Sequence, residues 1–223
     1  MTAPPVRAVI FDMDGVILDT EPVHRAAWQR AAAECGFRIT DEMYAECLGR
    51  TDADGAAILL RTFGEAFPLP KFRSCRALYW REHVALHGVQ TKPGLFDLLD
   101  LLDTHRLPRA VATGTHRATA LGLLDRARLR DRFSLLVGGD EVPRGKPEPD
   151  IYLAAAARLG VSPEDCLVLE DSGPGACAAR AAGMRVVLIP DLAPPSAETA
   201  AQAHAVRASL CEVGPLVLAT FRE

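Results

Sequence analysis

The sequence lacks the features that mark membrane, secreted and nucleic-acid-binding proteins. No apolar stretch approaches the ~20 residues of a membrane span, and none has the form of a signal peptide. Basic residues number 25 against 29 acidic ones, so the net charge of −4 supplies no basic field for nucleic acid. We therefore expect a cytoplasmic protein with neither a membrane nor a nucleic-acid partner.

Cysteine and lysine are both scarce. No cysteine falls in a CxxC pair or a Cys/His pattern, which argues against zinc and against a disulfide framework. Most cysteines are expected to pack as small apolar side chains: Cys35, Cys47, Cys75, Cys166, Cys177 and Cys211. The lysines are only Lys71, Lys92 and Lys146, and every other basic residue is an arginine. A lysine inside a motif therefore indicates a need for a compact ammonium group.

What the chain does contain is typical of a soluble globular protein. Its 223 residues are 49% hydrophobic and 24% charged, enough for one sizeable core plus a smaller insert. Strands are predicted at 9–11, 109–113, 135–137, 166–170 and 185–189, with a weaker one at 205–207. Helices are predicted at 21–35, 41–48, 52–63, 71–87, 94–104, 116–126, 149–159 and 173–182.

The order of these elements predicts the fold class, which is α/β. Alternating strands and helices after residue 90 indicate a doubly wound, mainly parallel, Rossmann-like sheet. The helices between the first two strands are expected to form an inserted all-helical cap. The predicted core is 1–18 with 90–223, and the predicted cap is 19–89. Two chain crossings between them would suit a hinge over a crevice.

Two carboxylates follow the first predicted strand. Asp12 and Asp14 stand two residues apart, after the apolar run 9–11 and before Gly15. At the carboxyl end of a parallel strand they would share a ligand-binding crevice. Like charges ~4 Å apart repel by about 4 kcal/mol at an effective dielectric of ~20, so a cation or a shared proton must offset them. The alternative is a metal-free turn.

Three further segments place functional groups beside predicted strands. Thr113 and Gly114 end the second strand and could donate to phosphate oxygens, although turn and helix-capping residues look the same. Lys146 lies in a loop before a helix, where a surface lysine is the structural alternative. Glu170 and Asp171 end the fourth strand, and such acidic pairs favour a hard cation such as Mg²⁺ over a mere helix cap.

Together, these motifs resemble those of the haloacid dehalogenase-like (HAD) superfamily, over essentially the whole chain. The residues that carry the resemblance are, in motif order, Asp12-x-Asp14-Gly15-Val16, Thr113, Lys146 and Glu170-Asp171. The helical insert resembles the family's C1 cap. Residues 12–24 (DMDGVILDTEPVH) resemble the subgroup of β-phosphoglucomutase and small sugar-phosphate phosphatases. Each motif alone is weak evidence for the family, whereas the four motifs in this order are specific for it.

The resemblance implies roles for the motif residues. Asp12 would attack phosphorus and form an aspartyl phosphate, and Asp14 would protonate the leaving oxygen and then activate water. Lys146 would neutralise the nucleophile and the transferring group. Thr113 and backbone N–H groups, including that of Gly114, would bind phosphoryl oxygens.

The resemblance also implies Mg²⁺ as cofactor. An oxygen of Asp12, the backbone carbonyl of Asp14 and the carboxylate of Asp171 would hold the ion. Glu170 would support the metal from behind, or contact it directly. True dehalogenases lack the second aspartate of the first motif, so the presence of Asp14 argues against dehalogenation.

The choice between phosphatase and phosphomutase depends on substrate-binding residues. The resemblance places five of them: Gly114, Thr115, His24, Arg50 and Thr51. β-Phosphoglucomutases carry cations where this chain has Asp52 and His116, which favours a phosphatase acting on a small phosphate ester, such as a sugar phosphate. A β-phosphoglucomutase-like mutase and a non-catalytic phosphometabolite-binding protein stay open as alternatives. The sequence indicates neither the individual substrate nor the oligomeric state.

Overall fold

The computed structural model describes residues 5–47, 52–192 and 194–220. The strands in these ranges are β1 (Ala8–Phe11), β2 (Arg109–Ala112), β3 (Leu135–Val137), β4 (Cys166–Glu170), β5 (Arg185–Leu188) and β6 (Ala205–Val206). The α-helices described are α1 (Glu21–Glu34), α2 (Asp41–Ala45), α3 (Asp52–Phe63), α4 (Leu69–His87), α5 (Leu95–Thr104), α6 (Arg117–Arg126), α7 (Asp150–Leu159), α8 (Gly173–Ala181), α9 (Ala197–Gln202) and α10 (Val213–Thr220).

The strands form one sheet in the order β3-β2-β1-β4-β5-β6, and every neighbouring pair is parallel. This order reverses between β1 and β4, so the crevice beyond their carboxyl ends is the expected ligand site of a doubly wound sheet. The α/β, Rossmann-like fold predicted from the sequence is confirmed. The two acidic motifs follow these two central strands.

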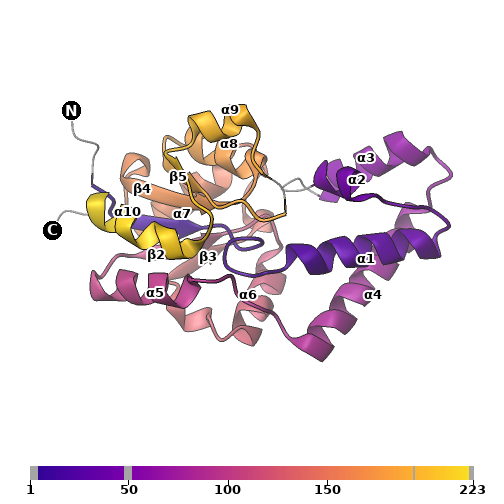
Figure 1. Ribbon diagram of the computed structural model, residues 1–223, viewed down its shortest axis with the longest axis horizontal. Coiled ribbons are helices and arrows are strands. Elements are labelled where there is room, and N and C mark those ends of the chain that lie inside the picture. Colours follow the sequence, from indigo (N-terminus) through magenta and orange to yellow (C-terminus); the bar gives the residue numbers. More distant parts are fainter. Residues whose placement is uncertain (1–4, 48–51, 193, 221–223) are drawn as a thin grey trace.

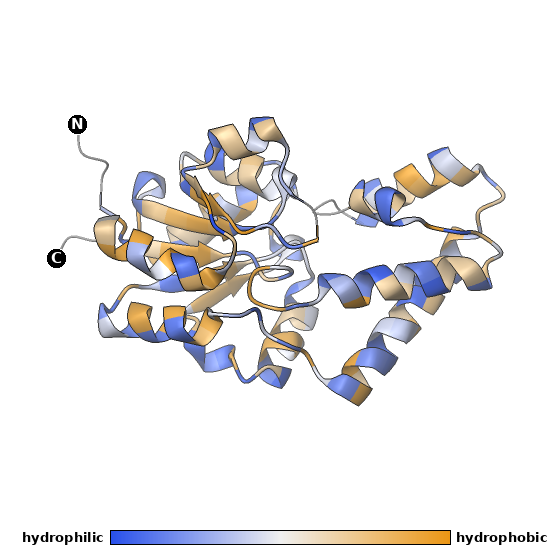
Figure 2. Ribbon diagram, viewed as in Figure 1, coloured by the Kyte–Doolittle hydropathy of each residue, from blue (hydrophilic) through white to orange (hydrophobic). Residues whose placement is uncertain are grey.

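Both faces of the sheet are covered, and this explains the unbroken apolar runs of the strands. Val9 and Phe11 face helices α5, α6 and α10, whereas Ala8 and Ile10 face α7 and α8. All four residues of β1 are fully buried. Figure 2 shows the strands as a continuous hydrophobic layer between helices whose outer faces are polar. A strand buried on both faces has no polar alternation.

Helices α1 to α4 stand apart from the sheet, to the right in Figure 1. They have a hydrophobic cluster of their own, in which Trp28 packs edge-on against Tyr44 and Phe72. Among the described residues, no helix here or in the rest of the fold combines the length and apolar character that crossing a bilayer requires.

The chain passes between the sheet and these helices twice, and the two passages lie side by side. The Asp19 N–H donates to the Gln90 carbonyl at 2.9 Å, and Leu18 forms a bridge with Thr91. Lys92 Nζ contacts Asp19 Oδ1 at 3.3 Å and Asp191 Oδ1 at 2.7 Å. The helical block is therefore joined to the sheet by paired segments.

The structure also contains two helices that the sequence analysis missed. Helix α9 is short, and Ser196 caps it by accepting from the Thr199 N–H at 3.1 Å. Helix α10 follows the last strand and buries Val213 and Val217 against the sheet. Helix α2 ends at Ala45, three residues before the predicted boundary, which lies outside the described residues.

Candidate active site

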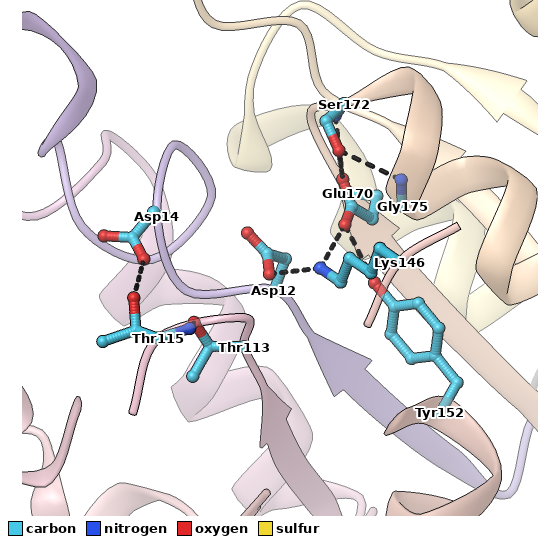
Figure 3. A network of polar contacts seen from close by, with 9 residues as sticks. All are labelled: Asp12, Asp14, Thr113, Thr115, Lys146, Tyr152, Glu170, Ser172 and Gly175. Atoms are coloured by element: carbon cyan, nitrogen blue, oxygen red, sulfur yellow. Dashed lines mark hydrogen bonds and ion pairs between the residues drawn. The ribbon is translucent and has the colours of Figure 1, made fainter. Parts of the chain in front are cut away.

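Lys146 lies between two carboxylates at the carboxyl ends of β1 and β4 (Figure 3). Its Nζ is 2.5 Å from Asp12 Oδ1 and 2.5 Å from Glu170 Oε1. The lysine side chain is 8% exposed, so solvent screens these contacts little. Although burial alone lowers the pKa of Lys146, the charges of Asp12 and Glu170 raise it well above its usual value. The ammonium is therefore held in its charged form.

Glu170 is fully buried, and four hydrogen-bond donors fix the orientation of its carboxylate. Oε1 accepts from Lys146 and from the Tyr152 hydroxyl at 2.9 Å, while Oε2 accepts from the Ser172 N–H and hydroxyl at 2.8 and 2.9 Å. Burial raises the pKa of Glu170, but the charge of Lys146 outweighs it and leaves the pKa below its usual value. Both oxygens of this carboxylate are thus occupied by protein donors.

Gly175, in the first turn of α8, leaves room for Glu170. A Cβ at this position would stand 1.7 Å from Glu170 Oε1 and 2.0 Å from its Cδ, so no larger residue fits without displacing the carboxylate. The substitution Gly175→Ala is therefore expected to destabilise the protein by about 1–3 kcal/mol through overpacking.

Gly122 is the matched control, since it is also a helical glycine but has open space around it. Gly122→Ala is expected to stabilise the protein by up to about 1 kcal/mol because alanine is the better helix former. Urea unfolding of both variants measures the difference. Equal effects of the two substitutions would contradict this account of Gly175.

Asp14 lies in a different environment from Asp12. Its Oδ1 accepts from the Thr20 hydroxyl at 2.7 Å and its Oδ2 from the Thr115 hydroxyl at 3.0 Å, so the carboxylate faces α1 and the loop after β2. His24 Nε2 is 4.0 Å from Asp14 Oδ1, and its ring stacks on Trp80 at a centroid distance of 3.9 Å. Asp14 is therefore set apart from the lysine that neutralises Asp12.

The acidic residues at the strand ends fit a hard divalent cation. Asp12, Glu170 and Asp171 each offer a carboxylate oxygen, and these atoms lie within 4.8 Å of one another. Burial, with the charges of Glu170 and Asp14, raises the pKa of Asp12 to about 8 despite Lys146. Burial and the charges of Glu170 and Asp12 also raise the pKa of Asp171. One lysine thus leaves negative charge uncompensated, and oxygen ligands suit Mg²⁺.

Gly15 brings the loop after β1 close to Asp171. Its φ of +80° is in the left-handed region, and a Cβ there would stand 2.3 Å from Asp171 Oδ2. Only glycine meets both requirements. The glycine of the first motif therefore sets the approach of this loop to the fourth motif.

A further, half-buried carboxyl lies at the start of α1. Glu21 Oε2 accepts from the Tyr44 hydroxyl at 2.7 Å. Burial, helped by the charges of Asp14 and Asp191, raises the pKa of Glu21 to about 7 from its usual 4.5. The folded protein therefore binds this proton more tightly than the unfolded chain, and stability must fall as pH rises from about 4.5 through about 7.

The substitution Glu21→Gln removes this cost while keeping an acceptor for Tyr44. We expect it to stabilise the protein by about 2 kcal/mol at pH 8.5 and to have little effect below pH 4. Urea midpoints across this pH range test the expectation, with exposed Glu164→Gln as control. A stabilisation that does not change with pH would contradict it.

The structure brings together most of the residues singled out in the sequence. Thr113 is buried at the end of β2, where its Oγ1 accepts from the Thr115 N–H at 3.1 Å. Gly114, between them, is exposed. The predicted substrate-binding residues Arg50 and Thr51 lie outside the described residues.

Four side chains around the site were not predicted from the sequence. Thr20, Tyr152 and Ser172 hold Asp14 or Glu170, and Trp80 stacks on His24. Thr20 precedes a helix and reads as its cap, yet its side chain makes no capping hydrogen bond and binds Asp14 instead. No local pattern marks Tyr152 or Trp80, since each comes from a helix distant in sequence.

Known proteins are similar to this chain in sequence and in fold. The family model of the haloacid dehalogenase-like hydrolases matches residues 6–183. A phosphorylated carbohydrates phosphatase of Thermotoga maritima is 36% identical over 179 residues, which cover 80% of this chain and 82% of that protein. Fructose-1-phosphate phosphatase YqaB of Escherichia coli is 36% identical over 181 residues, which cover 80% of this chain and 94% of that protein.

A solved structure matches nearly the whole fold of this chain. CbbY of Rhodobacter sphaeroides, in complex with xylulose-(1,5)bisphosphate, is 31% identical, with a TM-score of 0.81 over 94% of this chain and 96% of that chain. The match in sequence spans both acidic motifs, Thr113 and Lys146. The chain therefore belongs to the haloacid dehalogenase-like hydrolases.

Proposed function

We propose that this protein is a phosphatase that hydrolyses a small phosphorylated metabolite, a sugar phosphate in particular, through an aspartyl phosphate on Asp12. The observation that carries the proposal is that the two aspartates lie in different surroundings. Asp12 is buried against a cation, whereas Asp14 is held 3.0 Å from Thr115 and 2.7 Å from Thr20. The phosphatase relatives act on phosphorylated carbohydrates and on fructose 1-phosphate by name, which supports a sugar phosphate.

The first half-reaction uses both aspartates. A carboxylate oxygen of Asp12 forms a bond to phosphorus, the bond from phosphorus to the ester oxygen breaks, and Asp14 gives its proton to the departing alcohol. Lys146 neutralises the charge on Asp12 that would otherwise repel the phosphate dianion. The hydroxyl of Thr113 and backbone N–H groups of the loops after β1 and β2 stabilise the phosphoryl oxygens.

The second half-reaction reverses the role of Asp14. Its carboxylate takes a proton from water, the resulting hydroxide attacks phosphorus, and the bond to Asp12 breaks. Phosphate leaves and Asp12 is again a carboxylate. Thr20 and Thr115 keep Asp14 in place for both steps by donating to its two oxygens.

Asp12, Asp171 and the backbone carbonyl of Asp14 are the groups proposed to hold Mg²⁺. The ion would act as an electrophile that offsets the negative charge of the phosphoryl group and orients it toward Asp12. Glu170, whose oxygens already accept from Lys146, Tyr152 and Ser172, supports this arrangement indirectly.

Residues 19–89 are proposed to act as a cap that closes over the site and excludes water. The paired passages at Asp19 and Gln90 would form the hinge. His24 reaches the site from α1, where its imidazole is 4.0 Å from Asp14 and can interact with the aspartate that moves the proton.

A phosphate-release screen over phosphorylated metabolites tests the proposal. With Mg²⁺ present we expect free phosphate from sugar monophosphates, and a chelator is expected to abolish it until Mg²⁺ is restored. An isomerised sugar phosphate with little free phosphate would indicate a mutase instead. No turnover of any ester, including an aryl phosphate, would favour a binding protein.

A further inference from the structure

Helices α1 and α4 pack against each other and place two pairs of side chains across their interface. The His24 ring stacks on the Trp80 ring at a centroid distance of 3.9 Å. One helical turn away, Arg76 Cζ lies 5.1 Å from the centroid of the Trp28 ring. Because residues four apart share a face of a helix, the two pairs belong to one continuous interface. The packing of the two helices therefore builds the stack.

Trp80 contacts both parts of the fold. It belongs to α4, in the helical block, yet it is half-buried against the hydrophobic cluster that β1 forms with α5, α6 and α10. Val89, at the second passage between the block and the sheet, packs on the same cluster. The indole ring is thus held from two sides, by His24 of α1 and by the apolar side chains of the sheet domain.

The parallel arrangement of the two rings fixes the plane of the imidazole. The His24 and Trp80 rings are 2° from parallel. Trp28, which fills the hydrophobic cluster of the helical block, instead meets Tyr44 and Phe72 edge-on, at 81° and 80°. A side chain that only fills space can pack edge-on in this way. Face-to-face contact also determines the directions in which the nitrogens of the His24 ring point.

The stacked imidazole turns Nε2 toward Asp14. This atom is 4.0 Å from Asp14 Oδ1, the oxygen that also accepts from the Thr20 hydroxyl at 2.7 Å. A separation of 4.0 Å exceeds a hydrogen bond, so a small rotation of the ring decides how closely the imidazole approaches this carboxylate. The His24 side chain is 32% exposed, and without the stack its other rotamers become accessible. Trp80 therefore determines where Nε2 lies.

We propose that Trp80 is a positioning residue for proton transfer at Asp14, and that it acts by holding the imidazole of His24 beside this aspartate. This inference rests on the proposed phosphatase function. When Asp14 gives its proton to the departing alkoxide, its carboxyl group becomes a carboxylate, and an N–H of the imidazole stabilises that developing charge. No proton moves to or from His24 in this step. Loss of Trp80 should therefore slow the reaction only where the leaving oxygen needs a proton.

The choice of leaving group separates this role from a purely structural one. Fructose 1-phosphate and glucose 6-phosphate release an alkoxide that must be protonated, whereas p-nitrophenyl phosphate releases a stable anion. The value of kcat/KM reports the reaction up to the departure of this group. For the faster of the two sugar phosphates we expect Trp80→Leu to lower kcat/KM by about three- to tenfold, the range of one aromatic pair. For the aryl phosphate the loss should stay below about twofold.

A double-mutant cycle tests whether Trp80 acts through His24. His24→Ala should lower kcat/KM for the sugar phosphate at least as much as Trp80→Leu does, and Trp80→Leu should cause no further loss in the His24→Ala protein. Trp80→Phe should keep nearly the full rate, since a phenyl ring can still stack on the imidazole. The control is Leu86→Ala, because Leu86 is an exposed apolar residue on the same helix. Additive losses in the cycle would overturn the inference.

Proton NMR tests the stack itself, without reference to activity. Among the six histidines, His24 should have ring protons shifted upfield by the ring current of Trp80, and Trp80→Leu should abolish the shift. If Trp80→Leu does not fold, Trp80→Met, which keeps more of the buried volume, takes its place. Unshifted His24 protons in the wild type, equal losses for both kinds of ester, or turnover of the aryl phosphate only would overturn the inference. Absence of hydrolysis even of p-nitrophenyl phosphate would contradict the proposed function instead.

Discussion

Asp12→Asn is expected to lower phosphate release by at least about 10⁴-fold while the protein stays folded. An amide oxygen cannot form a stable acyl phosphate, and loss of a covalent nucleophile removes the whole reaction path. The fold should persist, since the asparagine oxygen can still accept from Lys146 Nζ. Removing a carboxyl whose pKa burial raises to about 8 also removes a charge that is costly to bury.

Steady-state phosphate release and thermal unfolding, measured together, separate the two effects. Asp97→Asn is the matched control, because Asp97 is exposed on α5. The control should retain full activity and stability. Activity of Asp12→Asn within tenfold of the wild type would rule out Asp12 as the nucleophile.

Lys146→Met has the second largest expected effect, on stability as well as on activity. It leaves Asp12 and Glu170 buried and facing the vacated ammonium position, and removal of one partner from a buried ion pair typically costs about 3–5 kcal/mol. Activity should fall by at least about 10³-fold, because the remaining charge repels the phosphate dianion. Lys71→Met is the control, since Lys71 makes an exposed contact with a backbone carbonyl.

The pH dependence of this loss has a definite sign. Without Lys146 the carboxyls of Asp12 and Glu170 hold protons to higher pH in the folded state than in the unfolded one, so the stability deficit should shrink as pH falls toward 4. Lys146→Met/Glu170→Gln should recover part of the stability without recovering activity. Urea unfolding in the absence of Mg²⁺ measures both. A deficit that is constant from pH 8 to pH 4 would contradict this account of the lysine.

The sequence was sufficient to predict the fold and the positions of the motif residues, for physical reasons. Strands buried on both faces are apolar, as β1 is throughout and β4 is up to Glu170, and a parallel sheet collects their carboxyl ends at one edge. Asp12 and Glu170 had to meet there once the strands were identified. Lys146 was conspicuous because the chain otherwise uses arginine almost everywhere.

The contacts that orient the motif residues could not be predicted in the same way. Tyr152, on α7, donates a hydrogen bond to Glu170, and Tyr44 donates one to Glu21, which lies 23 residues before it in the sequence. Both hydrogen bonds depend on how the helices pack. Thr20 carried an ambiguous signal, because a threonine before a helix is usually its cap.

The most direct test of the account is the search for the covalent intermediate. With an aryl phosphate, whose leaving group needs no proton from Asp14, Asp14→Asn should still form it but hydrolyse it slowly, because the amide cannot take a proton from water. Mixed with a good substrate and quenched in acid, this variant should yield a peptide that carries a phosphoryl group on Asp12, and Asp12→Asn should yield none. A phosphorylated residue other than Asp12, or turnover by the wild type with no protein-bound phosphoryl group at any time, would contradict the central claim.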